Sequence, residues 1–409
     1  MTNNTQFSVL NFHKDNRVNI VITILVFYII VIISLFQGCA RDTAQTRTEE
    51  TAAGTRTGAA AGAAIGAGVG LLEGLIGASY RPPHVTVRIF YATGRNQTKS
   101  TDPAKFFGAD RGELSYGICH VSIPRDHRMG ALESPSMWKL QFREDPTKHV
   151  ILWSIIPTEK NQYFEELANH IRAASGKNAF VFIHGYNVTF EDAARRTAQI
   201  AYDLGFDGAP ILYSWPSQGT FEGYSIDETN IEWTQTTLRR FLDDVVLHTT
   251  TDNIYLIAHS MGNRALTRAF STLVYDNPTL RQRFRAVILT APDIDASIFK
   301  RDIVPQLVGS DSSITLYASS EDKALLASKK FHGYPRAGDA GVGLILVSGI
   351  DTIDATGVDT SFIGHSYFPE ARSVLADMFY LIRDGKRPDQ RFALEPVEIA
   401  GKRYWKFRP

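Results

Sequence analysis

Residues 256–265 read LIAHSMGNRA, and this stretch decides the fold class. An apolar run ends at Ala258, and a helical pattern begins directly after Ser260. A serine at a tight turn from strand to helix is typical of a nucleophile elbow, whose usual signature is G-x-S-x-G. Here alanine stands in place of the first glycine. Because the turn only requires small residues two before and two after the serine, Ala258 and Gly262 satisfy it. We therefore predict that Ser260 is a nucleophile.

An ordinary serine that caps the helix is the alternative interpretation of Ser260. A nucleophilic serine needs a base to take its proton, and the base needs an acid to orient it, in the chain order serine, acid, histidine. His365, in FIGHSYF, follows the last predicted strand and precedes a helix that we expect from Pro369 to about Ile382. We predict that His365 is the base rather than a surface or capping histidine.

Several carboxylates could supply the acid. Asp322 follows the predicted strand SITLYAS by three residues, at the same sheet edge as the serine, and is the preferred candidate. Glu321 is a possible substitute, and Asp293 and Asp295, after the strand AVILTAP, are the second choice. The sequence favours Asp322 and leaves the others open. The aspartates close to His365 are predicted to structure its loop; they are Asp351, Asp354 and Asp359.

A tetrahedral intermediate also needs donors for its oxyanion. One donor is expected from the backbone N–H of the residue after the nucleophile, Met261. The second is expected from the turn FVFIHGYN, where Tyr186 N–H is the candidate and Gly185 gives the backbone room. His184 precedes the nucleophile in this turn, so we expect it to be structural. His259 is expected to pack beside the sheet.

The body of the chain alternates apolar runs with helical patterns. Runs bounded by Gly, Pro, Asn or Asp predict strands at 85–92, 117–124, 149–156, 179–185, 210–216, 253–260, 284–292, 313–319 and 343–350. Helical patterns cover 161–175, 188–204, 227–248, 262–276, 295–308 and 322–331. This alternation predicts an α/β-hydrolase fold, with a mostly parallel central sheet, helices on both faces and an antiparallel N-terminal edge. The hydrolase domain should span 80–391, followed by a C-terminal hairpin tail at 392–409.

The N-terminal segment predicts a membrane anchor within residues 1–39. Residues 18–36 carry no charge and are long enough to span about 30 Å of hydrocarbon as a helix. The preceding Lys14 and Arg17 favour a body outside the cytoplasm. The run ends in LFQGCA, which resembles a bacterial lipoprotein signal with Cys39 as the lipidated residue. An uncleaved single-pass helix is the alternative. Either anchor predicts a location in the bacterial cell envelope.

Two further segments separate the anchor from the body. Residues 40–57 are polar and aperiodic, which predicts a flexible tether. Residues 58–79 are rich in Gly and Ala, and Gly58, Gly62, Gly66, Gly70 and Gly74 recur at every fourth position. Such a stripe on a helix permits close helix contact, so we predict a membrane-associated helix that could drive self-association. A flexible Gly/Ala linker is the alternative.

The composition of the chain argues against several classes of partner and cofactor. Lys and Arg together number 43, as do Asp and Glu, so the formal net charge is zero and a nucleic-acid partner is not expected. The two cysteines, Cys39 and Cys119, cannot form a disulfide framework or a cysteine-based zinc site. The stretch 58–79 lacks G-K-[ST] after a strand, so nucleotide binding is not indicated. We expect neither a metal nor another cofactor.

Seven segments in order carry a family resemblance. They are YATGRNQT, RGELSYGICHVSIPRDHRMGALE, FIHGYNVTFEDAARR, YSWPSQG, AHSMGNRAL, APDID and GHSYF. Together they resemble a bacterial family of uncharacterised α/β-hydrolases of the esterase/lipase superfamily, over roughly residues 85–385. The resemblance implies the fold, and the family has no well-defined substrate. The predicted triad and oxyanion donors favour a serine hydrolase acting on small-molecule or lipid esters, or a thioesterase or peptidase with the same triad. A non-enzymatic membrane scaffold on a hydrolase fold is the competing hypothesis.

Overall fold

The computed structural model describes residues 82–135, 141, 143–309, 312–341, 343–358 and 372–408. The anchor at 1–39 with Cys39, the tether at 40–57, the glycine stripe at 58–79 and His365 lie outside the described residues. No helix within the described part is both long and apolar enough to cross a membrane.

One central sheet runs through the described part of the chain. Its strand order is β10-β11-β9-β8-β7-β6-β4-β5-β1-β2-β3. The strands are β1 (His84–Gln97), β2 (Phe107–Pro124), β3 (Ile151–Thr158), β4 (Asn178–Ile183), β5 (Gly208–Ser214), β6 (Asn253–His259), β7 (Phe284–Thr290), β8 (Ser313–Ala318), β9 (Asp351–Asp354), β10 (Leu394–Ile399) and β11 (Lys402–Phe407). From β9 through β1 all neighbours pair in parallel. Both β1–β2 and β2–β3 pair antiparallel, which confirms the predicted N-terminal edge.

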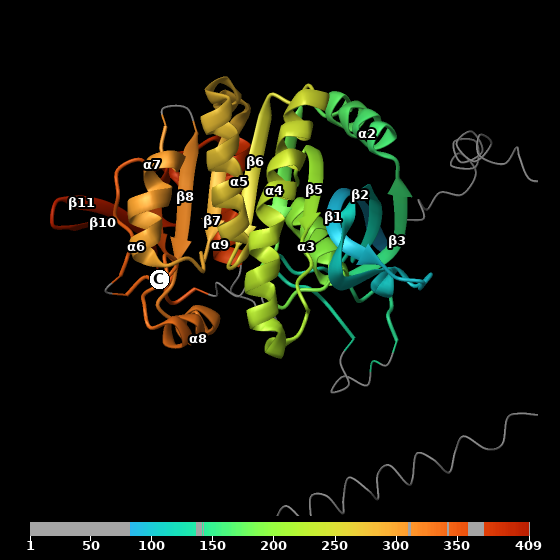
Figure 1. Cartoon of the computed structure of the whole chain (residues 1–409), viewed down its shortest axis with the longest axis horizontal. Coiled ribbons are helices and arrows are strands. Elements are labelled where there is room, and N and C mark those ends of the chain that lie inside the picture. Colours follow the sequence, from blue (N-terminus) through green and yellow to red (C-terminus); the bar gives the residue numbers. More distant parts are fainter. Residues whose placement is uncertain are drawn as a thin grey trace, which may run out of the picture. The chain divides into compact units, whose positions relative to one another are not determined.

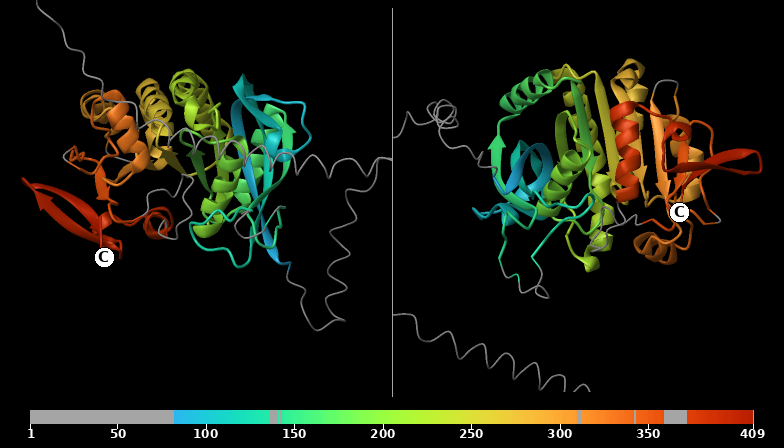
Figure 2. Two further views of the ribbon diagram at one scale, coloured as in Figure 1. Left: turned by 90° about the horizontal axis from the view of Figure 1, so that it is seen from below. Right: turned by 180° about the vertical axis from the view of Figure 1, so that it is seen from behind.

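Helices cover both faces of the sheet (Figures 1 and 2). The main helices are α2 (Lys160–Ala173), α3 (Phe190–Asp203), α4 (Tyr224–His248), α5 (Gly262–Asp276), α8 (Lys323–His332) and α9 (Arg372–Asp384). Buried side chains of α2, α4 and α5 join the core on one face, and those of α3 and α9 join the core on the other. This arrangement confirms the predicted α/β-hydrolase architecture.

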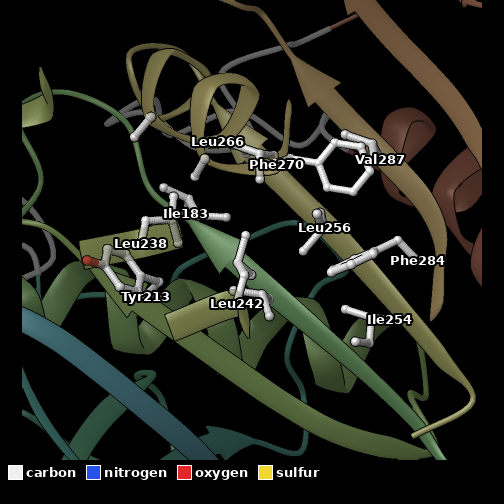
Figure 3. Close-up of a cluster of buried hydrophobic side chains, with 14 of the residues drawn as sticks. Ile183, Tyr213, Leu238, Leu242, Ile254, Leu256, Leu266, Phe270, Phe284 and Val287 are labelled. Atoms are coloured by element: carbon white, nitrogen blue, oxygen red, sulfur yellow. The ribbon is translucent and has the colours of Figure 1, made fainter. Parts of the chain in front are cut away.

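The core between the sheet and helices α4 and α5 explains why the central strands are continuous apolar runs. Ile183 of β4, Leu256 of β6 and Val287 of β7 meet Leu238 and Leu266 of the covering helices (Figure 3). All five side chains are fully buried. A strand buried on both faces cannot alternate apolar with polar residues, so the runs are apolar throughout.

Two predicted elements differ from the structure. The predicted strand at 343–350 is wrong: the described residues of this segment form a loop, and the strand β9 begins only at Asp351. Ile345 and Ile350 are buried there without strand pairing, and Gly349 turns the chain at φ +88°. The expected helix over 295–308 is broken into α6 (Ala296–Ile298), a π-helical turn (Phe299–Ile303) and α7 (Val304–Leu307).

The strand order places the topological switch point of the sheet beside Ser260. β4 lies between β5 and β6, and α3 connects β4 to β5 on one face while α4 returns to β6 on the other. Ligands of open α/β sheets bind at such a switch point, beyond the carboxyl ends of the strands. Figure 1 shows α8 beyond the edge toward which β8 points, so α8 lies at this same end of the sheet.

Candidate active site

Ser260 stands in a strained turn at the carboxyl end of β6. Its φ is +48°, although it is not a glycine, and it is 9% exposed. Asn187 (φ +58°) and Ala291 (φ +46°) adopt the same unusual region just beyond β4 and β7. Left-handed non-glycine residues cost about 1–3 kcal/mol and cluster at functional sites. Three of the five such residues in the described part follow adjacent strands here, so backbone strain is concentrated at this edge of the sheet.

The backbone of Ser260 is held from both sides. Its N–H donates to Thr290 O of β7 at 3.0 Å. Its carbonyl accepts from Asn263 N at 3.2 Å, from Asn263 Nδ2 at 3.0 Å and from Asp293 N at 3.2 Å. These bonds to the neighbouring strand and its following loop offset the strain of the turn. The sequence did not predict the roles of Asn263, Thr290 and the Asp293 N–H.

Two glycines permit the turn to sit against β4. A Cβ on Gly262 would stand 2.4 Å from His184 O, a backbone atom that cannot move aside. A Cβ on Gly185 would stand 3.1 Å from the Cβ of Ser260 and 2.7 Å from His259 Nδ1. Ala258, in contrast, is fully buried in the core, where its methyl group has room. The elbow therefore needs glycine after the serine and tolerates alanine before it.

The two predicted oxyanion donors adjoin residues that are in place: Met261 follows Ser260 directly, and Tyr186 follows Gly185, where a Cβ would stand 3.1 Å from the Cβ of Ser260. Met261 N–H and Tyr186 N–H make no hydrogen bond to any described residue of the chain. Met261 is the residue before the first turn of α5, and the N-terminal end of a helix favours negative charge. The Tyr186 side chain is anchored away from the serine, because its hydroxyl donates to Phe221 O and its ring packs against Tyr224 at 5.1 Å.

His184 is a structural residue, as the sequence predicts. Its Nδ1–H donates to Gly185 O at 2.8 Å, so Nε2 is the unprotonated nitrogen and accepts from Trp215 N at 3.2 Å. The imidazole of His184 and the indole of Trp215 stack with their centroids 5.1 Å apart. Burial, and then the charge of Arg95, hold the pKa of His184 well below its usual value. A neutral histidine with both nitrogens engaged braces the turn and does not exchange protons.

Arg95 and Asp227 hold this turn against the loop after β5. Arg95 is buried and donates to Val188 O at 2.7 Å, Ser217 O at 2.9 Å and Ser214 Oγ at 2.9 Å. Burial lowers its pKa to about 9. Asp227, at the start of α4, accepts from Ser217 Oγ at 2.6 Å. The donors around the site are thus held by buried charges that sequence reasoning did not identify.

His259 is a poor candidate for the base. Burial, and then the charge of Arg196, lower the pKa of His259 to about 3, so its imidazole accepts a proton only weakly. Its Nδ1 has no hydrogen-bond partner within the described residues and faces the space that Gly185 leaves. The side chain fills this space beside the sheet, as expected.

Asp322 lies beyond β8, two strands away from Ser260. Its Oδ1 accepts from Leu325 N at 2.9 Å and so caps α8. The loops after β8 and β9 are held together by Ser320 N, which donates to Thr356 Oγ1 at 3.0 Å. The described residues that precede His365 in the chain, up to Val358, therefore include a loop that lies beside the Asp322 loop. Glu321 is exposed and accepts from Gly357 N at 3.3 Å.

The second-choice acids are engaged elsewhere. Asp293 is 2% exposed, and its carboxylate accepts four hydrogen bonds, from Tyr224, Arg264, Ser328 and Arg336. Asp295 Oδ1 caps α6 by accepting from Ser297 N at 2.8 Å and Ile298 N at 3.0 Å. No group of three or more His, Cys, Asp or Glu side chains within the described part could hold a metal ion.

The fold and the elbow define a class, the α/β hydrolases. The chain belongs to the family described as alpha/beta hydrolase of unknown function (DUF900), whose model matches residues 159–384, more than half of the chain. No curated protein matches the sequence.

Three solved structures share some similarity with the chain. A protein described as a cell surface hydrolase, from Lactobacillus plantarum WCFS1, is 13% identical over 52% of this chain and 94% of its own, with a TM-score of 0.34. LpqC, a poly(3-hydroxybutyrate) depolymerase from Bordetella parapertussis, is 12% identical over 76% of this chain and 92% of its own, with a TM-score of 0.31. Lipase B from Aspergillus fumigatus is 12% identical over 55% of this chain and 54% of its own, with a TM-score of 0.27. At these scores the likenesses carry no argument about substrate.

Proposed function

We propose that the protein is a serine hydrolase that cleaves carboxylic esters through an acyl-enzyme. The observation that carries the proposal is Ser260, held at φ +48° at the end of β6 and in contact with the Gly185 turn. A non-glycine residue is kept in this conformation only when the surrounding structure compensates the strain. The turn presents a serine side chain at the switch point of the sheet. The backbone N–H groups of Met261 and Tyr186 make no hydrogen bond to a described residue, which leaves them free for an oxyanion.

Each residue has a role in the proposed reaction. Ser260 Oγ attacks the ester carbonyl while His365 takes its proton, and Asp322 orients the histidine. The N–H groups of Tyr186 and Met261 hold the oxyanion. His365 then returns the proton to the leaving alcohol. Water, activated by the same histidine, attacks the acyl group and releases the acid and free Ser260.

The position of Asp322 supports its role as the acid. Adjacent strands lie about 4.8 Å apart, so β8 and β6 are separated by about 10 Å across β7. Two hydrogen bonds of about 2.8 Å and the width of an imidazole bridge most of that gap. The histidine would enter from the segment after β9, which adjoins the Asp322 loop.

Labelling of the full-length chain with a fluorophosphonate probe tests the proposal. We expect the wild-type protein to be labelled, and Ser260→Ala and His365→Ala to lose labelling, because the probe reacts only with an activated serine. Ser313→Ala, in β8, and His248→Ala, at the exposed end of α4, are the matched controls and should label normally. A wild-type protein that resists labelling would support the competing scaffold hypothesis.

A panel of acyl esters and thioesters of increasing chain length then separates esterase from thioesterase activity. A peptide substrate series distinguishes a peptidase, which would use the same triad. Preferential turnover of the thioesters or peptides over the matched esters would overturn the ester assignment while leaving the nucleophile in place.

We further propose that the N-terminal segment attaches the enzyme to a membrane of the bacterial cell envelope, with the hydrolase domain outside the cytoplasm. The uncharged run at 18–36 and the following Cys39 support attachment. Mass spectrometry of the N-terminus distinguishes a lipidated Cys39 from a retained helix. Recovery of an unmodified chain in the soluble fraction of its native cells would refute both.

A further inference from the structure

We infer that Asp293 is a positioning residue that locks the nucleophile, the oxyanion turn and the acid-bearing helix α8 into one arrangement. The inference rests on the proposed serine hydrolase function and adds a residue to it. Asp293 follows β7, and its carboxylate accepts hydrogen bonds from four side chains of the protein. We therefore do not assign it a contact with substrate. It acts through the groups to which it is bonded.

The first connection runs to the nucleophile. Asp293 N–H donates to Ser260 O at 3.2 Å, which stabilises the strained turn directly. Its own carbonyl accepts from Arg264 Nε at 2.6 Å, and Arg264 belongs to the first turn of α5, the helix that follows Ser260. The segment after β7 is therefore tied to the elbow at the serine itself and in the first turn of α5.

The second connection runs to the oxyanion turn. Tyr224, the first residue of α4, donates its hydroxyl to Asp293 Oδ2 at 2.8 Å. The Tyr224 ring packs edge-on against Tyr186, with centroids 5.1 Å apart. Tyr186 supplies the proposed backbone donor, so Asp293 fixes one wall against which this donor rests.

The third connection runs to the helix that carries the acid. Ser328, which is 4% exposed, donates its hydroxyl to Asp293 Oδ1 at 2.5 Å. Ser328 lies in the middle of α8, and Asp322 is the capping residue of this helix. Helix α8 therefore cannot shift relative to the elbow without breaking the bond between Ser328 and Asp293. The bond fixes the distance between Asp322 and Ser260.

Charge balance makes this arrangement rigid. Arg336 Nε lies 2.7 Å from Asp293 Oδ1 and Arg264 Nη2 lies 3.0 Å from Asp293 Oδ2, so two guanidinium groups share one carboxylate. Glu228 pairs with Arg264 at 2.8 Å. Burial alone would raise the pKa of Asp293, but the two arginines and two hydroxyl donors outweigh it and keep the carboxyl ionised. Neutralising Asp293 would leave buried positive charge without its partner.

The test uses the full-length chain and separates the rate of serine modification from binding. For the fluorophosphonate probe, kinact reports activation of the serine and KI reports binding. We expect Asp293→Asn to lower kinact about 10-fold to 100-fold with KI within about 2-fold, because misplacement costs reactivity more than affinity. Asp377→Asn is the matched control. Asp377 is equally buried, accepts from a tyrosine, Tyr317, and pairs with Arg391, but it lies on the opposite face of the sheet.

Milder variants keep the test decisive if Asp293→Asn does not fold. Ser328→Ala removes the hydroxyl that joins α8 to Asp293 and that also lies 3.1 Å from the Tyr224 hydroxyl. Tyr224→Phe removes the hydroxyl that donates to Asp293. Each should lower kinact several-fold, whereas the control Tyr317→Phe should stay within about 2-fold of wild type. In an Asp322→Asn background Ser328→Ala should lower kinact less than it does in the wild-type background, because the connection to α8 acts through Asp322. A purely structural serine would lower kinact equally in both backgrounds.

The outcomes separate this inference from the proposed function. If the wild-type chain is labelled but Asp293→Asn, or both milder variants, retain wild-type kinact while folded, the positioning role is overturned and the serine hydrolase stands. Equal losses in the Asp377 and Tyr317 controls would also overturn it. If the wild-type chain is not labelled at all, the proposed function fails, and this inference fails with it.

Discussion

Gly185 and Ser260 lie so close that a methyl group on Gly185 would stand 3.1 Å from the Cβ of the serine. The two residues belong to loops 75 positions apart in the chain, which β4 and β6 bring together as neighbouring parallel strands. The contact joins the nucleophile turn to the turn that carries Tyr186. The site therefore depends on the absence of a side chain as much as on the residues that are present.

Gly185→Ala adds only one methyl group, but we expect it to lower the esterase activity strongly. The new methyl group would meet His259 Nδ1 at 2.7 Å and push apart the two turns. We expect a loss of about 100-fold in kcat/KM toward a soluble ester, since small displacements of reacting groups are costly. Gly341→Ala is the control, because this exposed glycine would meet only the Asp339 side chain. Wild-type kinetics in Gly185→Ala would show that the turns are not in functional contact.

Ala258→Gly should restore the usual pentapeptide without improving the enzyme. Ala258 is fully buried in β6, so the change removes a buried methyl group and loosens a strand. The free energy of unfolding should fall by about 1–2 kcal/mol, measured by denaturant titration. The ester kcat/KM should stay within about 3-fold of wild type, because the turn already has the geometry that it needs. A 10-fold rise in kcat/KM would mean that alanine compromises the elbow.

Local patterns were sufficient to predict most of the fold. The strand-to-helix transition at Ser260 and the order of apolar runs with intervening helices predicted the parallel sheet, because each depends on neighbouring residues. The predicted strand at 343–350 failed for a physical reason. Ile345 and Ile350 are buried from a loop, and burial alone gives an apolar run whether or not its backbone pairs with a strand.

The supporting network of the site could not be predicted from local patterns. Asp293 binds Tyr224, which is 69 positions away, and Ser328, which is 35 positions away. Nothing in the spacing of these residues indicates that they meet. Arg95 likewise has the sequence context of an ordinary surface arginine at the end of a strand, yet it is 2% exposed. Only the fold shows that its donors reach the loops around the oxyanion turn.

We expect the free energy of unfolding to fall at alkaline pH, because His127 then loses the proton that stabilises the folded state. Its side chain is 1% exposed and lies between Glu133 Oε2 at 2.8 Å and Asp203 Oδ1 at 2.9 Å. Burial alone would lower the pKa of His127, but its hydrogen bonds with Asp203 and Glu133 outweigh burial and raise the pKa to about 9. The unfolded value is about 6.5. The folded state therefore holds the proton more tightly than the unfolded state.

This stabilisation is fully present below about pH 6.5 and is lost as the pH rises through about 9, by on the order of 2–3 kcal/mol. Denaturant titrations of wild type and His127→Gln at pH 6 and pH 9.5 measure it. The difference in the free energy of unfolding between wild type and His127→Gln should be smaller at pH 9.5 than at pH 6. His248→Gln, on an exposed histidine, is the control. A difference for His127→Gln that is independent of pH would contradict a protonated His127.

Asp322→Asn separates catalytic orientation from helix capping. Asn caps helices about as well as Asp, so the bond to Leu325 N should survive and the stability of the protein should change little. An amide cannot stabilise the imidazolium that forms on His365, so kcat should fall roughly 10²-fold to 10⁴-fold. Asp295→Asn is the matched control, since Asp295 caps α6 in the same way. If Asp295→Asn loses activity and Asp322→Asn does not, the acid follows β7 instead of β8; if neither loses activity, the histidine is oriented by a group other than these two aspartates.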